Sequence, residues 1–384
     1  MTPIRNRTFA LASLALAAAL TACGGGGADT TARANITSLK VMGDSLADVG
    51  TFGIKFTIQG NDIYPERVGK QFGLTGQCSF FKFNGSTFIA NPTPGCTNYA
   101  IGGGVINATG SGMSAADPRG IAVQFATAAA GGNYAAGDLL LVDGGGNDAA
   151  ALVGAYLKAS TDGGAAYVAL LGTVLTPAQV ASAAAGGSAG LAAAGATYMT
   201  ALADKFYDII NAQALGKGAQ RVALLNMPGI TNTPRFQMVL DSIAAASGGG
   251  TTGATARAKS EALFKSWIEA FNTELDKRAA GDARVAVVDF YTEFNNQVMY
   301  PAQFGMTNVK TPACPITGVG SDGLPTYTFA TCTDAALAAA PPAGETGTSW
   351  YKTWGFSDSF HPTPYAHQLT SQLISRTLAR AGWL

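Results

Sequence analysis

The segment SLKVMGDS, residues 38–45, has the pattern of a buried β-strand that ends in a turn. Its apolar run is short and stops at Gly43, as is typical of strands that are covered on both faces. Three later segments share the pattern: GDLLLVDGGGND (137–148), AQRVALLNMPG (219–229) and ARVAVVDF (283–290). Strands with continuous apolar runs are characteristic of parallel sheets with helices on both faces.

Segments with helical patterns separate these strands. We expect helices over 62–74, from Pro118 onward, over 149–158 and 176–216, over 255–281, and from Pro362 to the C-terminus. We expect residues 76–116 and 292–357 to be irregular. The alternation predicts an α/β protein, a three-layer α/β/α sandwich with a central, mainly parallel sheet. No linker or repeat interrupts the chain, so we expect a single domain over residues 38–384.

The composition excludes several functions. The chain has a formal net charge of zero and only 12% charged residues, with no cluster of lysines and arginines. Nucleic acids are therefore not expected as partners, because phosphate backbones are bound by such clusters. There is no phosphate-binding GxxxxGK[ST] motif, no HExxH motif and no dinucleotide fingerprint after a strand. We therefore expect no cofactor and no metal, and we expect a monomer.

The N-terminus has the pattern of an export signal. Arg5 and Arg7 precede an uncharged run over residues 8–22, which is too short for a comfortable membrane span. The run ends in LTAC, which resembles a bacterial lipobox and implies that Cys23 is lipidated. We expect a signal peptide over 1–22 and a flexible tether over 23–37. The alternative is an ordinary signal peptide whose cleavage site adjoins a cysteine. The lipobox predicts an outer-membrane lipoprotein, facing the periplasm or the surface, or one released extracellularly.

Four cysteines follow the tether and allow three pairings. Neighbours in sequence are equally spaced, and each pair brackets a loop rich in proline and glycine. We predict disulfides Cys78–Cys96 and Cys314–Cys332, because disulfides persist in exported proteins. Zinc is the competing interpretation, but the chain has no CxxC, and no cysteine lies near a histidine in sequence.

Candidate catalytic groups follow the predicted strands. Ligands of open parallel sheets bind beyond the carboxyl ends of the strands, which is where Ser45 and Asn147 fall. A serine is a weak nucleophile until a base takes its proton, and histidine is the usual base. The chain has two histidines, and one of them, His361, follows Asp358 by three residues. Asp358 can therefore orient His361 toward Ser45. The backbone N–H of Ser45, an N–H in the glycine run 102–104 and the Asn147 amide are candidate donors to an oxyanion.

Each of these residues also has a structural interpretation. Ser45 is also suited to capping a helix, and Asn147-Asp148 is an ordinary turn or helix-capping pair. Asp358 in an exposed turn would leave His361 to be oriented by a carbonyl group. We expect the second histidine, His367, to be structural. We expect Asp44 and Asp48 to hold loop geometry through local hydrogen bonds.

Four blocks together resemble the GDSL (SGNH) serine hydrolases: GDSLADVG (43–50), NYAIGGG (98–104), GGND (145–148) and DSFHPT (358–363). The resemblance implies a flavodoxin-like fold and an esterase or lipase that forms an acyl-serine intermediate. It implies Ser45 as the nucleophile, Asp358 and His361 as the activating pair, and oxyanion donors from Ser45, Gly103 and Asn147. Gly102 is the alternative to Gly103. An acyltransferase or a phospholipase would use the same residues, and a surface-binding lipoprotein would keep the fold without activity.

The sequence says less about the substrate than about the reaction. We expect an ester. Lipidic esters are slightly favoured, because aromatic side chains in the two irregular segments are suited to line an acyl pocket. The same side chains are equally suited to core packing. They are Phe80, Phe81, Phe83, Phe88, Tyr300, Phe304, Tyr327, Trp350, Tyr351 and Trp354. The sequence GGSAG (186–190) matches the G-x-S-x-G motif of another hydrolase fold. That motif requires a preceding strand, and we expect a helix there.

Overall fold

A parallel sheet forms the centre of the computed structural model, which describes residues 34–384. Its strands are β1 (Ser38–Met42), β4 (Asp138–Val142), β5 (Val222–Leu225) and β6 (Val285–Val288), in the order β1-β4-β5-β6. All neighbours pair in parallel. The four strands predicted from apolar runs are confirmed.

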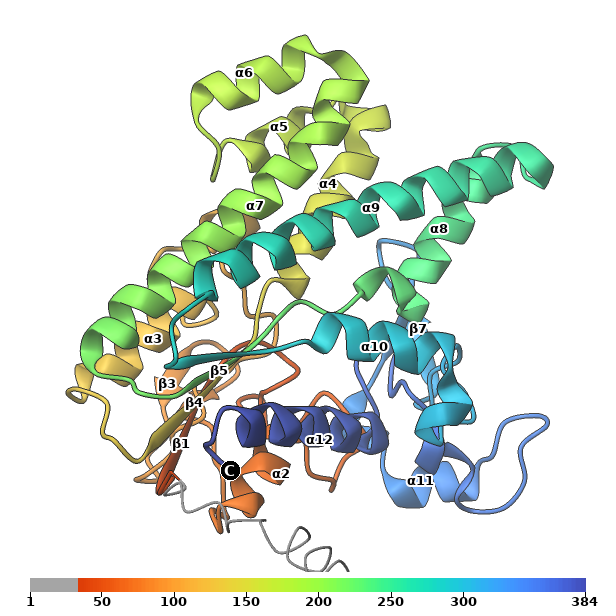
Figure 1. Cartoon of the computed structure of the whole chain (residues 1–384). Coiled ribbons are helices and arrows are strands. Elements are labelled where there is room, and N and C mark those ends of the chain that lie inside the picture. Colours follow the sequence, from red (N-terminus) through yellow and green to blue (C-terminus); the bar gives the residue numbers. More distant parts are fainter. Residues whose placement is uncertain (1–33) are drawn as a thin grey trace, which may run out of the picture. The chain divides into compact units, whose positions relative to one another are not determined.

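Helices cover both faces of this sheet (Figure 1). Helices α2 (Tyr64–Gln71) and α12 (Pro364–Arg380) contact each other on one face. Helices α3 (Ile121–Ala130), α7 (Gly187–Gln213) and α9 (Gly250–Ala279) lie on the other. The arrangement confirms the predicted α/β/α sandwich.

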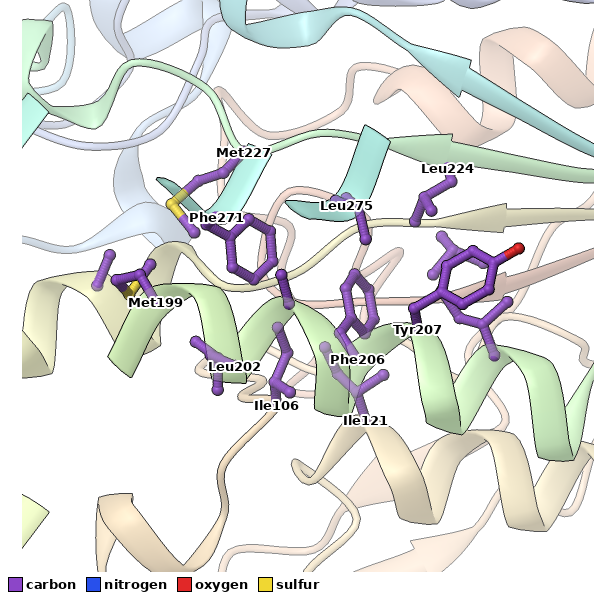
Figure 2. Packing of buried hydrophobic residues seen from close by; sticks show 14 of the residues in the cluster. Ile106, Ile121, Met199, Leu202, Phe206, Tyr207, Leu224, Met227, Phe271 and Leu275 are labelled. Atoms are coloured by element: carbon purple, nitrogen blue, oxygen red, sulfur yellow. The ribbon is translucent and has the colours of Figure 1, made fainter. Parts of the chain in front are cut away.

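The largest hydrophobic cluster lies between the sheet and α7 and α9. Figure 2 shows Leu202 and Phe206 of α7 against Phe271 and Leu275 of α9, with Leu224 of β5 nearby. All five side chains are fully buried. Burial of a side chain of this size stabilises a fold by roughly 1.5–3 kcal/mol. This packing fixes the layer that supports the carboxyl ends of the strands.

A further helical layer follows β4. Helix α4 (Gly146–Asp162) begins directly after that strand and is followed by α5 (Ala165–Leu171) and α6 (Pro177–Ala185). The GGSAG segment lies at the junction of α6 and α7, and Ser188 is exposed there. The segment therefore has no preceding strand, and it is not a nucleophile turn.

The segments predicted as irregular contain regular structure, so that prediction is wrong in part. Asp289 caps the helix α10 by accepting a hydrogen bond from the Thr292 N–H. Its sequence, FYTEFNNQVM, is poor in strong helix formers, which explains why the pattern did not reveal it. The predicted helix at Pro118 begins three residues later because a turn over 117–120 precedes it. The unpredicted elements, besides α5, are α8 (Pro234–Ala246), α10 (Phe290–Met299), α11 (Asp334–Ala339) and two hairpins, β2 (Phe81–Phe83) with β3 (Phe88–Ala90) and β7 (Ile316–Val319) with β8 (Pro325–Tyr327).

Each hairpin lies within a disulfide loop. Cys78 is bonded to Cys96 around β2 and β3, and Cys314 to Cys332 around β7 and β8, as the sequence predicts. Such bonds are typical of proteins outside the reducing cytoplasm. Among residues 34–384, none of the helices has the length and apolar character that crossing a bilayer requires. The predicted signal peptide and Cys23 lie outside the described residues.

Candidate active site

Ser45 lies in the turn that follows β1. The turn depends on Gly43, because a Cβ there would lie 2.1 Å from the Asp143 carboxylate. Gln124 of α3 holds the glycine by accepting from its N–H (2.8 Å) and donating to its carbonyl oxygen (2.9 Å). The Asp44 carboxylate accepts a hydrogen bond from the Leu46 N–H at 2.9 Å and closes a local turn around Ser45. Ser45 is therefore held at the carboxyl edge of the sheet.

The segment before α12 brings a histidine and an aspartate to this serine. His361 Nε2 lies 2.7 Å from Ser45 Oγ, and His361 Nδ1 lies 2.8 Å from Asp358 Oδ2. The other oxygen of Asp358 accepts from the N–H groups of Phe360 (2.8 Å) and His361 (2.5 Å). These hydrogen bonds fix the orientation of the carboxylate that contacts the imidazole. The three side chains thus have the geometry by which an aspartate orients a histidine toward a serine.

Opposing effects act on the pKa of Asp358. Burial raises the pKa, but the neighbouring His361 and the hydrogen bonds from His361 and Phe360 outweigh it, so the pKa lies below its ordinary value. Asp358 is therefore ionised at neutral pH and is suited to hold the imidazole by its Nδ1 side. Rings of Phe56 and Phe329 lie 5.2 and 5.7 Å from the His361 ring and shield its flanks.

In the glycine run beside Ser45, one backbone N–H has no hydrogen-bond partner within the described part of the chain. The Gly102 N–H donates to Asp48 Oδ2 at 2.9 Å, and the Gly104 N–H donates to the Ile101 carbonyl at 2.9 Å. The Gly103 N–H has no such partner, and its φ of 77° lies in the left-handed region that favours glycine. The backbone N–H of Gly103 is therefore the donor of this loop that is available to a ligand.

Asn147 lies in the first turn of α4 and faces the same loop. Its Nδ2 donates to the Gly104 carbonyl at 2.9 Å and makes only a long contact, 3.5 Å, with Asp44 Oδ2 through its other N–H. Asp148 accepts from the N–H groups of Ile106 (2.9 Å) and Asn107 (2.8 Å), and so attaches the glycine loop to α4. Ser45, Gly103 and Asn147 all line one open groove.

A model of the family described as GDSL-like Lipase/Acylhydrolase matches residues 39–374. The chain belongs to this family. Its members are carboxylic ester hydrolases, so this GDSL-like protein is an enzyme of that class. No match to a curated protein sequence was found. The match begins at β1 and ends in α12, so it includes every residue of the site.

Two hollows meet at Ser45 and His361 of the GDSL-like enzyme. The first is a narrow cavity of about 60 Å³, against the roughly 10–15 Å³ that one water molecule needs. Phe290, Phe294 and Phe356 belong to its mainly apolar wall. The second is the open groove, which is lined by more polar side chains, including Arg235 and Tyr327, and has a volume of about 420 Å³.

The aromatic side chains singled out in the sequence are, with one exception, not those that line the hollows. Of that group only Tyr327 lines either one. The three residues Trp350, Tyr351 and Trp354 pack around the Cys314–Cys332 disulfide instead. Phe290 and Phe294 were not predicted as lining residues because α10 was not predicted, although their spacing of four residues is that of one helix face.

A buried pair of carboxylic acids lies beneath Ser45. Asp143 Oδ1 accepts from the Asp44 N–H at 3.0 Å, and Asp143 Oδ2 accepts from the Tyr64 hydroxyl at 2.5 Å. Burial raises the pKa of both aspartates, and for Asp44 the nearby Asp143 charge raises it further. The pair therefore keeps a proton at pH values where an exposed aspartate has lost its own.

His367 does not reach Ser45. It lies in α12, is 1% exposed, and its Nδ1 accepts a hydrogen bond from the Tyr64 N–H at 3.4 Å. Burial, followed by the charges of Arg67, His361 and Lys55, holds its pKa well below the usual value, so it is neutral. Within residues 34–384, no cluster of His, Cys, Asp and Glu side chains has the arrangement of a metal site.

Proposed function

We propose that this enzyme hydrolyses carboxylic esters through an acyl group carried on Ser45. His361 takes the proton of Ser45 Oγ as this oxygen bonds to the ester carbonyl carbon. The bond from that carbon to the alcohol oxygen then breaks, and His361 gives the proton to the departing alcohol. Water, deprotonated by His361, attacks the acyl-serine, releases the acid and restores Ser45. Asp358 holds the imidazole and stabilises its charged form.

The developing oxyanion would be held by three donors. These are the N–H groups of Ser45 and Gly103 and the amide N–H of Asn147 whose only contact is the long one, 3.5 Å, with Asp44 Oδ2. The engagement of the Gly102 N–H by Asp48 favours Gly103 over Gly102 in this role. Donors fixed by other hydrogen bonds need no reorganisation as charge develops, which is the basis of oxyanion stabilisation.

The observation that carries this proposal is the continuous chain of contacts from Ser45 Oγ through His361 to Asp358, at 2.7 and 2.8 Å. The test uses p-nitrophenyl esters from acetate to palmitate with wild type and Ser45→Ala. We expect serine-dependent release of p-nitrophenol and rapid labelling of wild type by a fluorophosphonate. Turnover that persists in folded Ser45→Ala would sink the proposal. Analysis of products with added alcohol separates hydrolysis from acyl transfer.

We also infer that Cys23 carries a lipid and holds the enzyme at the outer membrane. The LTAC sequence supports this, and the extracytoplasmic setting indicated by the disulfides agrees with it. Membrane fractionation of cells that produce wild type or Cys23→Ser tests it. We expect wild type in the membrane fraction and the variant outside it. Equal partition of the two proteins would count against the anchor.

A further inference from the structure

An unpaired amide lies in the wall of the narrow cavity beside Ser45. Gln297 of α10 lines this cavity and is only 3% exposed. Its Nε2 is buried and has no hydrogen-bond partner among the described residues. A buried donor without a partner destabilises the fold, and such groups are rare in folded proteins. This cost is offset when a ligand with a hydrogen-bonding group enters the cavity.

Thr233, Thr370 and Asn226, three other uncharged polar residues of this wall, already make hydrogen bonds. Thr233 donates to the Ile230 carbonyl at 2.7 Å, and Thr370 donates to the Ala366 carbonyl at 3.0 Å. The Asn226 amide donates to Asp289 at 3.2 Å and accepts from the Tyr291 N–H at 2.8 Å. Among these uncharged groups, Gln297 is therefore the one whose buried side-chain nitrogen makes no hydrogen bond at all.

Around Gln297 the wall is apolar. It includes Phe294 and Val298 on the same helix, which pack against Met306, Val309 and Phe356. No lysine or arginine lines the cavity, while the buried Asp44 and Asp143 do. A charged carboxylate on the ligand would be desolvated there without a cation to pair with. The wall thus favours a hydrocarbon chain that carries one neutral oxygen.

We propose that the acyl chain of the substrate carries a hydroxyl or keto oxygen, which accepts a hydrogen bond from Gln297 within this cavity. The inference rests on the proposed function, since it places the acyl part of the ester in the cavity and the alcohol part in the open groove. The substrate class is thus a short hydroxyacyl or oxoacyl ester. The chemistry is unchanged: the released alcohol takes the Ser45 proton through His361, and water supplies the new oxygen of the released acid and the proton that returns to Ser45.

The test compares ethyl hexanoate with ethyl hydroxyhexanoates that carry the hydroxyl at successive carbons. Acid release gives kcat/KM for wild type, for Gln297→Met, which keeps the side-chain length, and for Gln297→Leu as a second apolar variant. We expect one hydroxyl position to be preferred about 3- to 10-fold over hexanoate in wild type, as a satisfied hydrogen bond predicts. In both variants this ratio should fall to about one.

Gln303→Met is the matched control, because Gln303 is exposed on the neighbouring turn and should leave the preference intact. Equal rates for all esters in wild type, or a preference that survives in the Gln297 variants, would overturn the inference. Failure of the proposed function has a different signature: no acid release from any ester and no fluorophosphonate labelling of Ser45. In that case, calorimetric binding of the esters to Ser45→Ala protein still decides whether the cavity prefers the hydroxyl.

Discussion

Asp48 connects the two loops that flank Ser45, although it touches neither Ser45 nor His361. Its Oδ1 accepts from the N–H groups of Gly50 (2.9 Å) and Thr51 (2.7 Å), and its Oδ2 accepts from Gly102. Burial raises the pKa of Asp48, while these hydrogen bonds lower it in part. A single carboxylate thus fixes the position of the neighbouring Gly103 N–H relative to the serine turn.

Asp48→Asn tests this positioning role. The amide keeps one acceptor oxygen but turns an NH₂ group toward one of the donors, so the glycine loop should shift. We expect kcat to fall roughly 10- to 100-fold, with KM changed less than about twofold because Asp48 itself lines neither hollow. Steady-state kinetics on one ester measures both quantities, and thermal unfolding shows whether the variant is folded.

The fluorophosphonate reaction supplies an independent readout, since its transition state uses the same oxyanion donors. Its rate should fall in parallel with kcat in Asp48→Asn. A rise in KM at unchanged kcat would instead assign Asp48 a part in substrate binding.

At the scale of elements, the two disulfide loops form a natural comparison. Each closes a loop with a sequence separation of 18 and each contains a hairpin. Only the Cys314–Cys332 loop supplies side chains near His361, with Tyr327 in the open groove and Phe329 against the imidazole. The loops should therefore differ in their effect on activity more than in their effect on stability.

Paired Cys→Ala substitutions test this difference. Removal of either disulfide should lower the free energy of unfolding by about 2–4 kcal/mol, as expected for loops of this length. Loss of Cys314–Cys332 should also raise KM, because the groove wall loosens, while loss of Cys78–Cys96 should leave KM near the wild-type value. Denaturant titration and ester kinetics measure the two effects. Equal KM changes in the two variants would show that the β7–β8 loop does not shape the site.

Two glycines show how differently one substitution acts within an element and at its end. Gly43→Ala places a Cβ 2.1 Å from Asp143 Oδ1 at the end of β1. Crowding of this kind costs about 1–3 kcal/mol, and it should displace Ser45, so activity should fall as well. Gly154→Ala lies inside α4 with no atom within 4 Å of its added Cβ. It should stabilise the protein by about 0.5–1 kcal/mol and leave activity unchanged.

Chemical denaturation of the two alanine variants measures these opposite changes in the free energy of unfolding. Equal stability changes would mean that the close approach at Gly43 is relieved by movement of Asp143. Fluorophosphonate labelling of Ser45 distinguishes a displaced nucleophile from a merely less stable fold.

Elements with strong local patterns could be predicted from the sequence, whereas elements fixed by distant contacts could not. The four strands were predictable because each is a continuous apolar run. Helix α10 was not, because its residues have weak helix propensity and its apolar face is defined by contact with α12 and Phe356. The narrow cavity depends on that helix, so its lining and Gln297 could not be identified either. The serine, histidine and aspartate that the structure brings together could be singled out because each lies in a short, chemically distinctive stretch.

At the scale of the whole molecule, buried acids with opposite pKa shifts make stability depend on pH in two directions. Asp358 has a lowered pKa, so its contribution is present above the usual aspartate pKa and is lost as the pH falls through the folded value. Asp44 and Asp143 have raised pKa values. Their contribution is complete below the usual aspartate pKa of about 4 and is lost as the pH rises through the folded values.

Asp143→Asn isolates the second effect, because asparagine does not titrate. The variant should be less stable than wild type at low pH, since its NH₂ group faces either the Tyr64 hydroxyl or the Asp44 N–H.

As the pH rises above about 4, the unfolded wild type loses a proton that the folded protein keeps. Wild type then loses about 1.4 kcal/mol per proton for each pH unit over which this difference persists, and the variant lacks the share of this loss that comes from Asp143. The stability gap should therefore narrow between pH 4 and neutrality, as measured by urea titrations at several pH values. A gap that widens over this range would mean that Asp143 is ionised in the folded protein and stabilised by Tyr64 as a carboxylate.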